Sequence, residues 1–182
     1  MDKKIIGITL ILLLGLMFFG CTSSSSNTTD GTNTTQPVAN NQTAQKVYQI
    51  GEKVTLGDLS YTMNSVEQMD ALRSEYVNKT ASDGATYYLA EFTIQNNGNS
   101  EKSVTISNDI KVIDSKGRTY KPDFALSMYA KQSGFEPFEI IDKIPAGLSK
   151  TGIVVFEMPI GTTGQLKINP SMFSGEATIE FK

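Results

Sequence analysis

The sequence predicts an antiparallel β-sandwich, and three observations support this fold class. Beyond Lys46, short segments repeatedly alternate apolar and polar residues with a period of two, which is the pattern of half-buried strands. Gly, Asn and Pro residues separate these segments, as expected of turns between strands. Few segments have helical periodicity, and no internal repeat is visible. Seven or more short strands of this kind indicate an all-β sandwich.

The clearest predicted strand lies within Gly84–Asn99, GATYYLAEFTIQNNGN. Alternate side chains point to one face, and the apolar ones are Tyr88, Ala90, Phe92 and Ile94. The intervening residues Glu91, Thr93 and Gln95 are polar. Asn96–Asn99 follows with residues that tolerate a positive φ, so we expect a tight hairpin turn there. The segment is therefore predicted to be a central strand of the sheet.

The first 20 residues have the layout of a secretory signal peptide. A short basic start, Met1–Lys4, precedes the apolar run Ile5–Gly20, which is shorter than a comfortable membrane span. Cys21 follows at once and is the only cysteine. Phe18-Phe19-Gly20-Cys21 resembles the lipobox of prokaryotic lipoproteins, with phenylalanines where aliphatic and small residues are usual. Cys21 is therefore the predicted lipidation site. The alternative is an uncleaved anchor with an incidental cysteine.

Residues 21–46 are predicted to be a lipidated cysteine followed by a flexible stalk. This segment consists almost entirely of Ser, Thr, Asn, Gln and small residues, so it has little to bury. As a coil it would span roughly 25–30 Å. Candidate glycosylation sites begin Asn-x-Ser/Thr triplets at Asn27, Asn33, Asn41 and Asn78. In a segment this rich in Asn and Thr, such triplets also arise by chance.

Residues 47–182 are predicted to form the single folded domain. Tyr48–Leu56 leads to a turn at Gly57-Asp58, and a strand carries the alternating Leu59, Tyr61 and Met63. Val66–Asp83 is polar and charged without an apolar stripe, so a long loop is expected. The domain has no cysteine, so its stability must come from packing and strand pairing.

After the central strand, further alternation predicts one run from Ser103 through Val112, since Val104, Ile106, Ile110 and Val112 recur in phase. Asp114–Gly117 is a predicted hairpin turn. Asp123 is expected to cap a short helix through Lys131 that ends at Gly134. A turn at Ile144–Gly147 and three more strands complete the domain, and they are centred on GIVVFEMP, on Leu166 and Ile168, and on Ala177, Ile179 and Phe181.

Several blocks occur in a recognisable order: IGEKVTLGDLSYTMNSVE, TYYLAEFTIQNNGNSEKSV, IKVIDSKGRTYKPD and IPAGLSKTGIVVFEMP. Together they resemble the telokin-like, immunoglobulin-type domain of bacterial and archaeal lipoproteins. This is a family of unknown function that is related in fold to a mycobacterial secreted immunogenic antigen. The resemblance covers about Val47–Lys182. It implies an immunoglobulin-like sandwich outside the cell and brings no catalytic residues with it.

The residues offer little catalytic chemistry. The chain has no histidine, which excludes Ser-His-Asp and Cys-His arrangements and the commonest transition-metal ligand. No Ser-x-x-Lys, calcium-loop or phosphate-loop motif occurs. We therefore predict no catalytic residues, no metal and no cofactor. The net charge is −3, which argues against nucleic-acid binding because such binding needs a concentrated positive field.

Two functional hypotheses follow for a chain lipid-anchored on the extracellular face of the cell membrane. The first, favoured by the residues and the resemblance, is a surface binding or structural module with an extracellular protein or glycan partner. The alternative is an envelope enzyme that uses carboxylates.

The predicted interaction surface is the apolar connection Pro122–Asp142, with Phe135 and Phe138 as candidate partner anchors. Tyr87 is a further candidate, for stacking on a sugar or a peptide. The alternative is that the connection is a helix-containing plug that closes one end of the sandwich with its aromatic residues buried.

Overall fold

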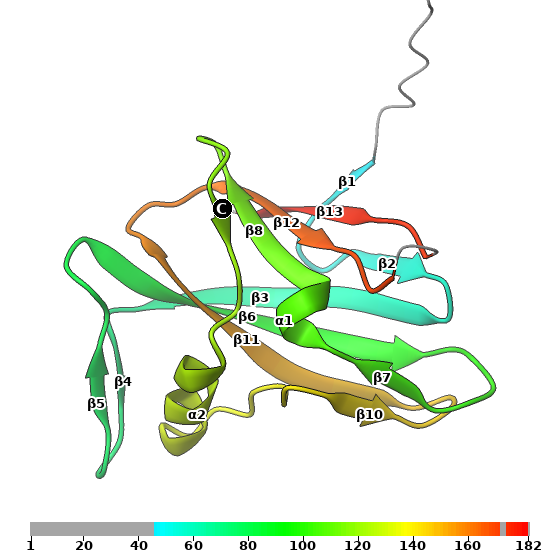
Figure 1. The fold of residues 1–182 in the computed structure, drawn as a ribbon, viewed down its shortest axis with the longest axis horizontal. Helices are drawn as coiled ribbons and strands as arrows, with labels where there is room; N and C mark the ends of the chain where they lie inside the picture. Colours follow the sequence, from blue (N-terminus) through cyan, green and yellow to red (C-terminus); the bar gives the residue numbers. More distant parts are fainter. Residues whose placement is uncertain (1–45, 172–173, 182) are drawn as a thin grey trace, which may run out of the picture. The chain divides into compact units, whose positions relative to one another are not determined.

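The computed structural model describes residues 46–171 and 174–181 (Figure 1). The predicted signal peptide lies outside the described residues, as do Cys21, Asn27, Asn33 and Asn41 and the stalk up to Gln45. The described part is a β-sandwich with two main sheets and two short helices. The predicted fold class is thereby confirmed.

One main sheet has four antiparallel strands in the order β11-β6-β3-β2. These strands are β2 (Lys53–Leu56), β3 (Leu59–Met69), β6 (Ala85–Asn96) and β11 (Ser149–Pro159). β6 pairs with β11 from Ala85 to Gln95 and with β3 on its other side, with a register shift between Met63 and Ser65. The prediction that β6 is a central strand is correct, because β6 lies between β11 and β3 in the sheet.

The second main sheet has five strands in the order β1-β13-β12-β8-β9. They are β1 (Val47–Tyr48), β8 (Ile110–Asp114), β9 (Thr119–Tyr120), β12 (Gly164–Ile168) and β13 (Ala177–Phe181). β1 runs parallel to β13, and the other neighbours are antiparallel. The predicted hairpin turn between β8 and β9 is confirmed, and Gly117 adopts the φ of 78° that this turn requires.

Two small sheets and two helices complete the described structure (Figure 1). β7 (Lys102–Val104) pairs with β10 (Asp142–Ile144), and β4 (Ala71–Arg73) pairs with β5 (Asn78–Thr80). The helices are α1 (Ile106–Asp109) and α2 (Phe124–Gln132).

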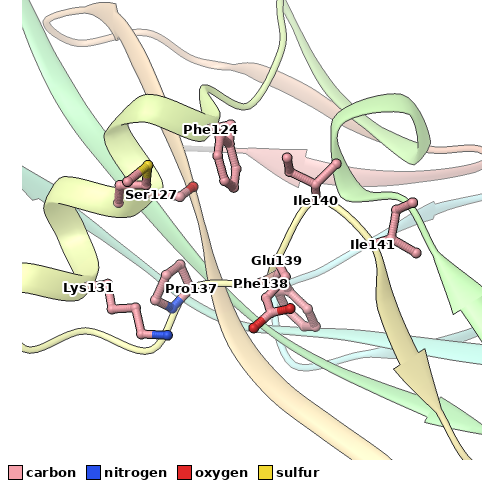
Figure 2. A pocket seen from close by; sticks show the side chains of 9 residues that line it. Phe124, Ser127, Lys131, Pro137, Phe138, Glu139, Ile140 and Ile141 are labelled. Atoms are coloured by element: carbon pink, nitrogen blue, oxygen red, sulfur yellow. The ribbon is translucent and has the colours of Figure 1, made fainter.

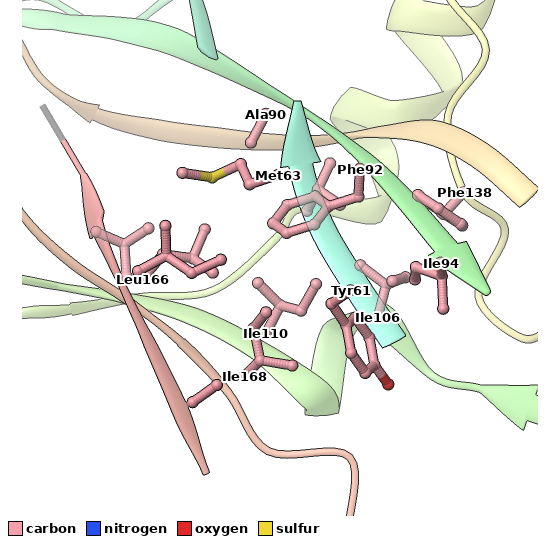
Figure 3. Close-up of a cluster of buried hydrophobic side chains, with 14 of the residues drawn as sticks. Tyr61, Met63, Ala90, Phe92, Ile94, Ile106, Ile110, Phe138, Leu166 and Ile168 are labelled. Carbon is pink, nitrogen blue, oxygen red and sulfur yellow. The ribbon is translucent and has the colours of Figure 1, made fainter. Parts of the chain in front are cut away.

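The main core lies between the two large sheets (Figure 3). The four-stranded sheet contributes the predicted inner face of β6, together with Tyr61 and Met63 of β3. The five-stranded sheet contributes the alternating apolar residues of its strands, namely Ile110, Val112, Leu166, Ile168, Ala177, Ile179 and Phe181. Burial of these side chains is the main favourable term for folding. The Tyr61 hydroxyl is buried without a hydrogen-bond partner in the described structure.

Three local predictions are wrong. Asn96–Asn99 does not close a hairpin, because the following strand, β7, pairs with β10 in a different sheet. Instead, the buried Asn96 amide donates to the carbonyl oxygens of Ser100 and Ile144, both at 2.8 Å. These bonds fix the chain as it leaves the sheet, so no left-handed turn is needed.

The predicted long loop Val66–Asp83 instead extends β3 to Met69 and then forms the β4–β5 hairpin. The predicted run from Ser103 through Val112 is also interrupted, by the single turn of α1. In this turn the Asp109 carboxylate accepts a hydrogen bond from the Thr105 backbone N–H at 3.0 Å. A side chain that bonds to the nearby backbone competes with strand pairing.

Candidate functional site

Helix α2 starts and ends close to the positions that the sequence predicts. The carboxylate of Asp123, the N-cap residue, accepts hydrogen bonds from the backbone N–H groups of Ala125 at 2.8 Å and Leu126 at 3.3 Å. The Asp123 backbone N–H donates to the carbonyl oxygen of Val155 in β11 at 3.1 Å. The first turn of α2 is therefore tied directly to the edge strand of the four-stranded sheet.

The inner side of α2 packs on the outer face of this sheet. Leu126 and Ala130 of α2 form a second buried cluster with outward-pointing residues of the sheet and of the hairpin, which are Leu72, Tyr87, Leu89, Ile153 and Val155. The connection is thus helix-containing and partly buried, but it covers a sheet face instead of plugging an end of the sandwich. The opposite side of α2 remains exposed, with Phe124 at 45% and Met128 at 53% of their full accessibility.

The segment after α2 is held against β11 by backbone hydrogen bonds. The Phe138 N–H donates to the Ile153 carbonyl at 3.1 Å, and the Ile153 N–H donates to the Glu136 carbonyl at 2.9 Å. Gly152 permits this approach, since a Cβ there would lie 3.0 Å from the Phe138 ring. This part of the connection is therefore fixed in position.

A second set of bonds closes the turn Glu139–Asp142. The nearly buried Asp142 carboxylate accepts a hydrogen bond from the Glu139 N–H at 2.8 Å and pairs with the Lys150 ammonium group. Ile140 and Ile141, between these fixed ends, are 51% and 56% exposed. Two adjacent isoleucines are thus displayed by a turn that is pinned at both ends.

Between α2 and this turn lies a cavity of about 500 Å³, which we call the α2 groove (Figure 2). Its lining residues are Phe124, Ser127, Met128 and Lys131 from α2 and Pro137, Phe138, Glu139, Ile140 and Ile141 from the following segment. Figure 2 shows Phe124 and Ile140 facing each other across it. A volume of this size falls within the range of small-molecule sites, and such sites are mostly apolar with a few polar groups.

The α2 groove carries two charged side chains, Lys131 and Glu139. Neither forms an ion pair with any residue in the described ranges. The Ser127 hydroxyl already donates to the Asp123 carbonyl at 3.2 Å. The groove therefore offers a large apolar surface and little hydrogen-bonding capacity beyond these two charges.

The predicted partner-binding residues need correction. Tyr87 is fully buried, and its hydroxyl donates to the Thr80 carbonyl at 2.9 Å, so its ring has no free face for a sugar or peptide. Phe138 is only 4% exposed and belongs to the main core. Phe135 is half-buried against the cluster under α2. The candidate glycosylation site Asn78 is exposed on β5.

The exposed apolar residues of the connection were not distinguished by the sequence from the buried ones. They are Phe124, Met128 and Tyr129 on α2 and the adjacent pair Ile140-Ile141, and all of these except Tyr129 line the α2 groove. Their sequence signal is weak but real, because two consecutive isoleucines in a turn cannot both point into one core. Phe124 and Met128 are four apart and therefore share a helix face.

The acidic residues are distributed among separate interactions. Asp70 pairs with Arg73, Asp114 with Arg118, and Asp142 with Lys150. Within residues 46–171 and 174–181, no group of three or more His, Cys, Asp or Glu side chains is arranged to hold a metal ion. Burial raises the pKa of Asp109 to about 6, but this residue lies at α1 and does not line the α2 groove.

In the same two ranges, no helix has the length and apolar character needed to cross a bilayer.

Comparison with known proteins places the domain in a family. Residues 48–178 match the model of a domain of unknown function, DUF4352. The chain is 29% identical over 115 residues to the uncharacterized protein YxkC of Bacillus subtilis, a match that covers 63% of this chain and 64% of YxkC. The chain thus spans less than two thirds of the length of that relative.

Solved structures share the fold at low identity. The secreted protein MPT63 of Mycobacterium tuberculosis superposes with a TM-score of 0.52 at 16% identity, covering 75% of this chain and 97% of MPT63. A candidate lipoprotein of Bacillus subtilis, YcdA, gives a TM-score of 0.50 at 18% identity, over 71% of this chain and 38% of YcdA. The family match and these β-sandwich structures confirm the resemblance stated from the sequence. This chain belongs to the DUF4352 family, a family of domains of unknown function.

Proposed function

We propose that this chain is a surface lipoprotein that presents its β-sandwich as a binding module, with the α2 groove as the site for an apolar ligand. The observation that carries this proposal is the pinned turn at Ile140-Ile141 opposite Phe124 and Met128. Contiguous exposed apolar surface costs solubility, and in soluble domains it commonly marks a binding site. A groove held open by hydrogen bonds also avoids the entropic cost of ordering on binding.

The sequence supports attachment through Cys21 to the outer face of the membrane, since a signal-like segment leads directly to this cysteine. YcdA is a candidate lipoprotein and MPT63 is secreted, which agrees with a location outside the cell.

Membrane attachment is tested by Cys21→Ser followed by cell fractionation. Lipidation requires the cysteine thiol, so the variant should be released or should keep an unprocessed signal. A variant that stays membrane-bound with the normal mature N-terminus would contradict the lipoprotein proposal.

Ligand binding is tested with Nile red, a neutral apolar dye, and with residues 22–182, which are the exported chain without its predicted lipidated Cys21. The dye's fluorescence should rise on binding, and the double variant Met128→Glu/Ile141→Glu should reduce its affinity at least tenfold, because charges would enter the apolar wall. Ile160→Glu is the matched control, since Ile160 is 69% exposed and does not line the α2 groove. Equal loss in the control, or no dye binding to the unmodified chain, would contradict the proposed site.

A further inference from the structure

We propose that the ligand of the α2 groove is a single-chain amphiphile with a carboxylate group, of the fatty-acid class. Its apolar chain would lie along the groove, and its carboxylate would pair with Lys131. This inference rests on the proposed function and adds to it the chemical class of the ligand. Three features of the groove support it. They are its continuation into a second cavity, its shortage of hydrogen-bonding groups, and the placement of its two charges.

The first feature is that the α2 groove continues into a second cavity. This cavity has a volume of about 260 Å³ and shares five lining residues with the first, namely Phe124, Ser127, Phe138, Glu139 and Ile140. It extends the apolar path toward α1, where Ile106 and Ser107 contribute to its lining, and toward Val154 of β11. Together the two cavities join Lys131 of α2 to Ile106 of α1 through a mostly apolar lining, which suits a hydrocarbon chain.

The second feature is the scarcity of hydrogen-bonding partners along this path. A peptide brings one N–H and one C=O per residue, and each of these groups needs a partner once it is removed from water. Along both cavities, the lining side chains with hydrogen-bonding groups are Ser107, Ser127, Lys131 and Glu139, and the Ser127 hydroxyl already donates to the Asp123 carbonyl. A hydrocarbon chain makes no such demand, so the lining favours an acyl chain over a polypeptide.

The third feature is the asymmetric placement of the two charges. Lys131 lines only the first cavity, whereas Glu139 lines both and therefore lies near their junction. Lys131 has no ion-pair partner in the described part of the chain. A carboxylate at the Lys131 end gains an opposite charge and stays farther from Glu139. This arrangement sets the direction in which the acyl chain of the ligand would lie in the groove.

The experiment uses the exported chain, residues 22–182, and cis-parinaric acid, a fluorescent fatty acid, below its micellar concentration. Lys131→Gln should weaken binding roughly two- to fivefold through loss of one solvent-exposed charge pair. Lys131→Arg should restore most of the affinity. Lys116→Gln is the matched control, because this lysine lies in the β8–β9 turn and lines neither cavity, and it should leave the affinity unchanged. Glu139→Gln should strengthen binding by removing a like charge.

Three outcomes would overturn the inference. These are no binding of cis-parinaric acid, the same affinity in Lys131→Gln as in the unmodified chain, or weaker binding in Glu139→Gln, which would show that Glu139 does not repel the bound carboxylate. Nile red keeps the two proposals separate. Normal Nile red binding, lost in Met128→Glu/Ile141→Glu, together with a fatty acid that does not respond to Lys131, would refute the ligand class and leave the binding module standing.

Discussion

Two long connections extend from the sandwich, and they differ in how many apolar side chains they expose to solvent. The connection between β3 and β6 forms the β4–β5 hairpin, which buries Ala71 and Leu72 and exposes Tyr76 alone at its tip, at 86%. The connection between β9 and β10 buries Leu126 and Phe138 and exposes a contiguous set of apolar residues around the α2 groove. A single exposed aromatic residue is normal on a protein surface, whereas a contiguous apolar set indicates binding.

The difference between the connections comes from how each is anchored. The hairpin is held by its own strand pairing, by Leu72 in the cluster under α2 and by the hydrogen bond from the Tyr87 hydroxyl to the Thr80 carbonyl. The second connection is fixed by the Asp123 cap, by backbone bonds to Ile153 and by the Asp142–Lys150 pair. Anchoring of this kind keeps exposed isoleucines in place, where a free loop would fold them inward.

The largest expected effect is that of Phe138→Ala. Phe138 belongs to the main core, so the cavity left by its ring should lower the free energy of unfolding by about 3–4 kcal/mol. Phe124→Ala is the control on the same connection, and it should cost less than about 1 kcal/mol because that ring is 45% exposed. Urea denaturation of both variants measures the difference. Equal losses would mean that Phe138 is not an anchor of the connection.

Asp142→Ala should have the next largest effect. It leaves the Lys150 ammonium group without its partner and removes the acceptor of the Glu139 N–H. A loss of about 2–3 kcal/mol is expected, since Lys150 is partly exposed and a fully buried pair would cost more. The variant should also bind Nile red less well, because the turn that carries Ile140 and Ile141 would no longer be pinned. Loss of stability with unchanged dye binding would show that the Asp142–Lys150 pair does not maintain the α2 groove.

Tyr87→Phe tests the contact between the central strand and the hairpin. It removes the hydrogen bond from the Tyr87 hydroxyl to the Thr80 carbonyl of β5 while keeping the buried ring. The free energy of unfolding should fall by about 1 kcal/mol. Amide hydrogen exchange should accelerate in β4 and β5 more than in α2. Faster exchange confined to α2 would contradict the assigned contact.

Tyr76→Ala should have the smallest effect. The side chain is almost fully exposed at the tip of the hairpin, so the free energy of unfolding should change by less than about 0.5 kcal/mol. Nile red binding should also be unchanged. A large fall in melting temperature would show that the tip packs against the domain in solution.

The regular strands were predictable from the sequence because their pattern is local. β6 and β11 alternate over many residues, and the ends of α2 follow from the Asp123 cap and from Gly134. The β4–β5 hairpin was missed because strands of three residues show no periodicity that distinguishes them from a loop. The Asn96–Asn99 segment was misassigned because its turn-forming residues do not show which strand the next segment will join.

The candidate site was predicted only as a segment. Pro122–Asp142 was identified by its apolar content. Phe138 and Ile140 are both apolar in the sequence, but Phe138 is buried and Ile140 is exposed in the structure. Which of them is buried depends on how the segment after α2 is held against β11 by the backbone bond between Phe138 and Ile153, and this is a long-range contact. Tyr87 was misjudged for the same reason, since its side chain lies on the sheet face that α2 and the hairpin cover.

The central claim is that the connection between β9 and β10 forms a pre-arranged binding groove. The most direct test is a methyl NMR titration of the exported chain, labelled at isoleucine and methionine methyl groups, with cis-parinaric acid. The signals of Met128, Ile140 and Ile141 should shift together and saturate, while that of Ile160, an exposed isoleucine that does not line the groove, should not move. Shifts at Ile160 of similar size, or no saturable shift at the three groove residues, would contradict the account.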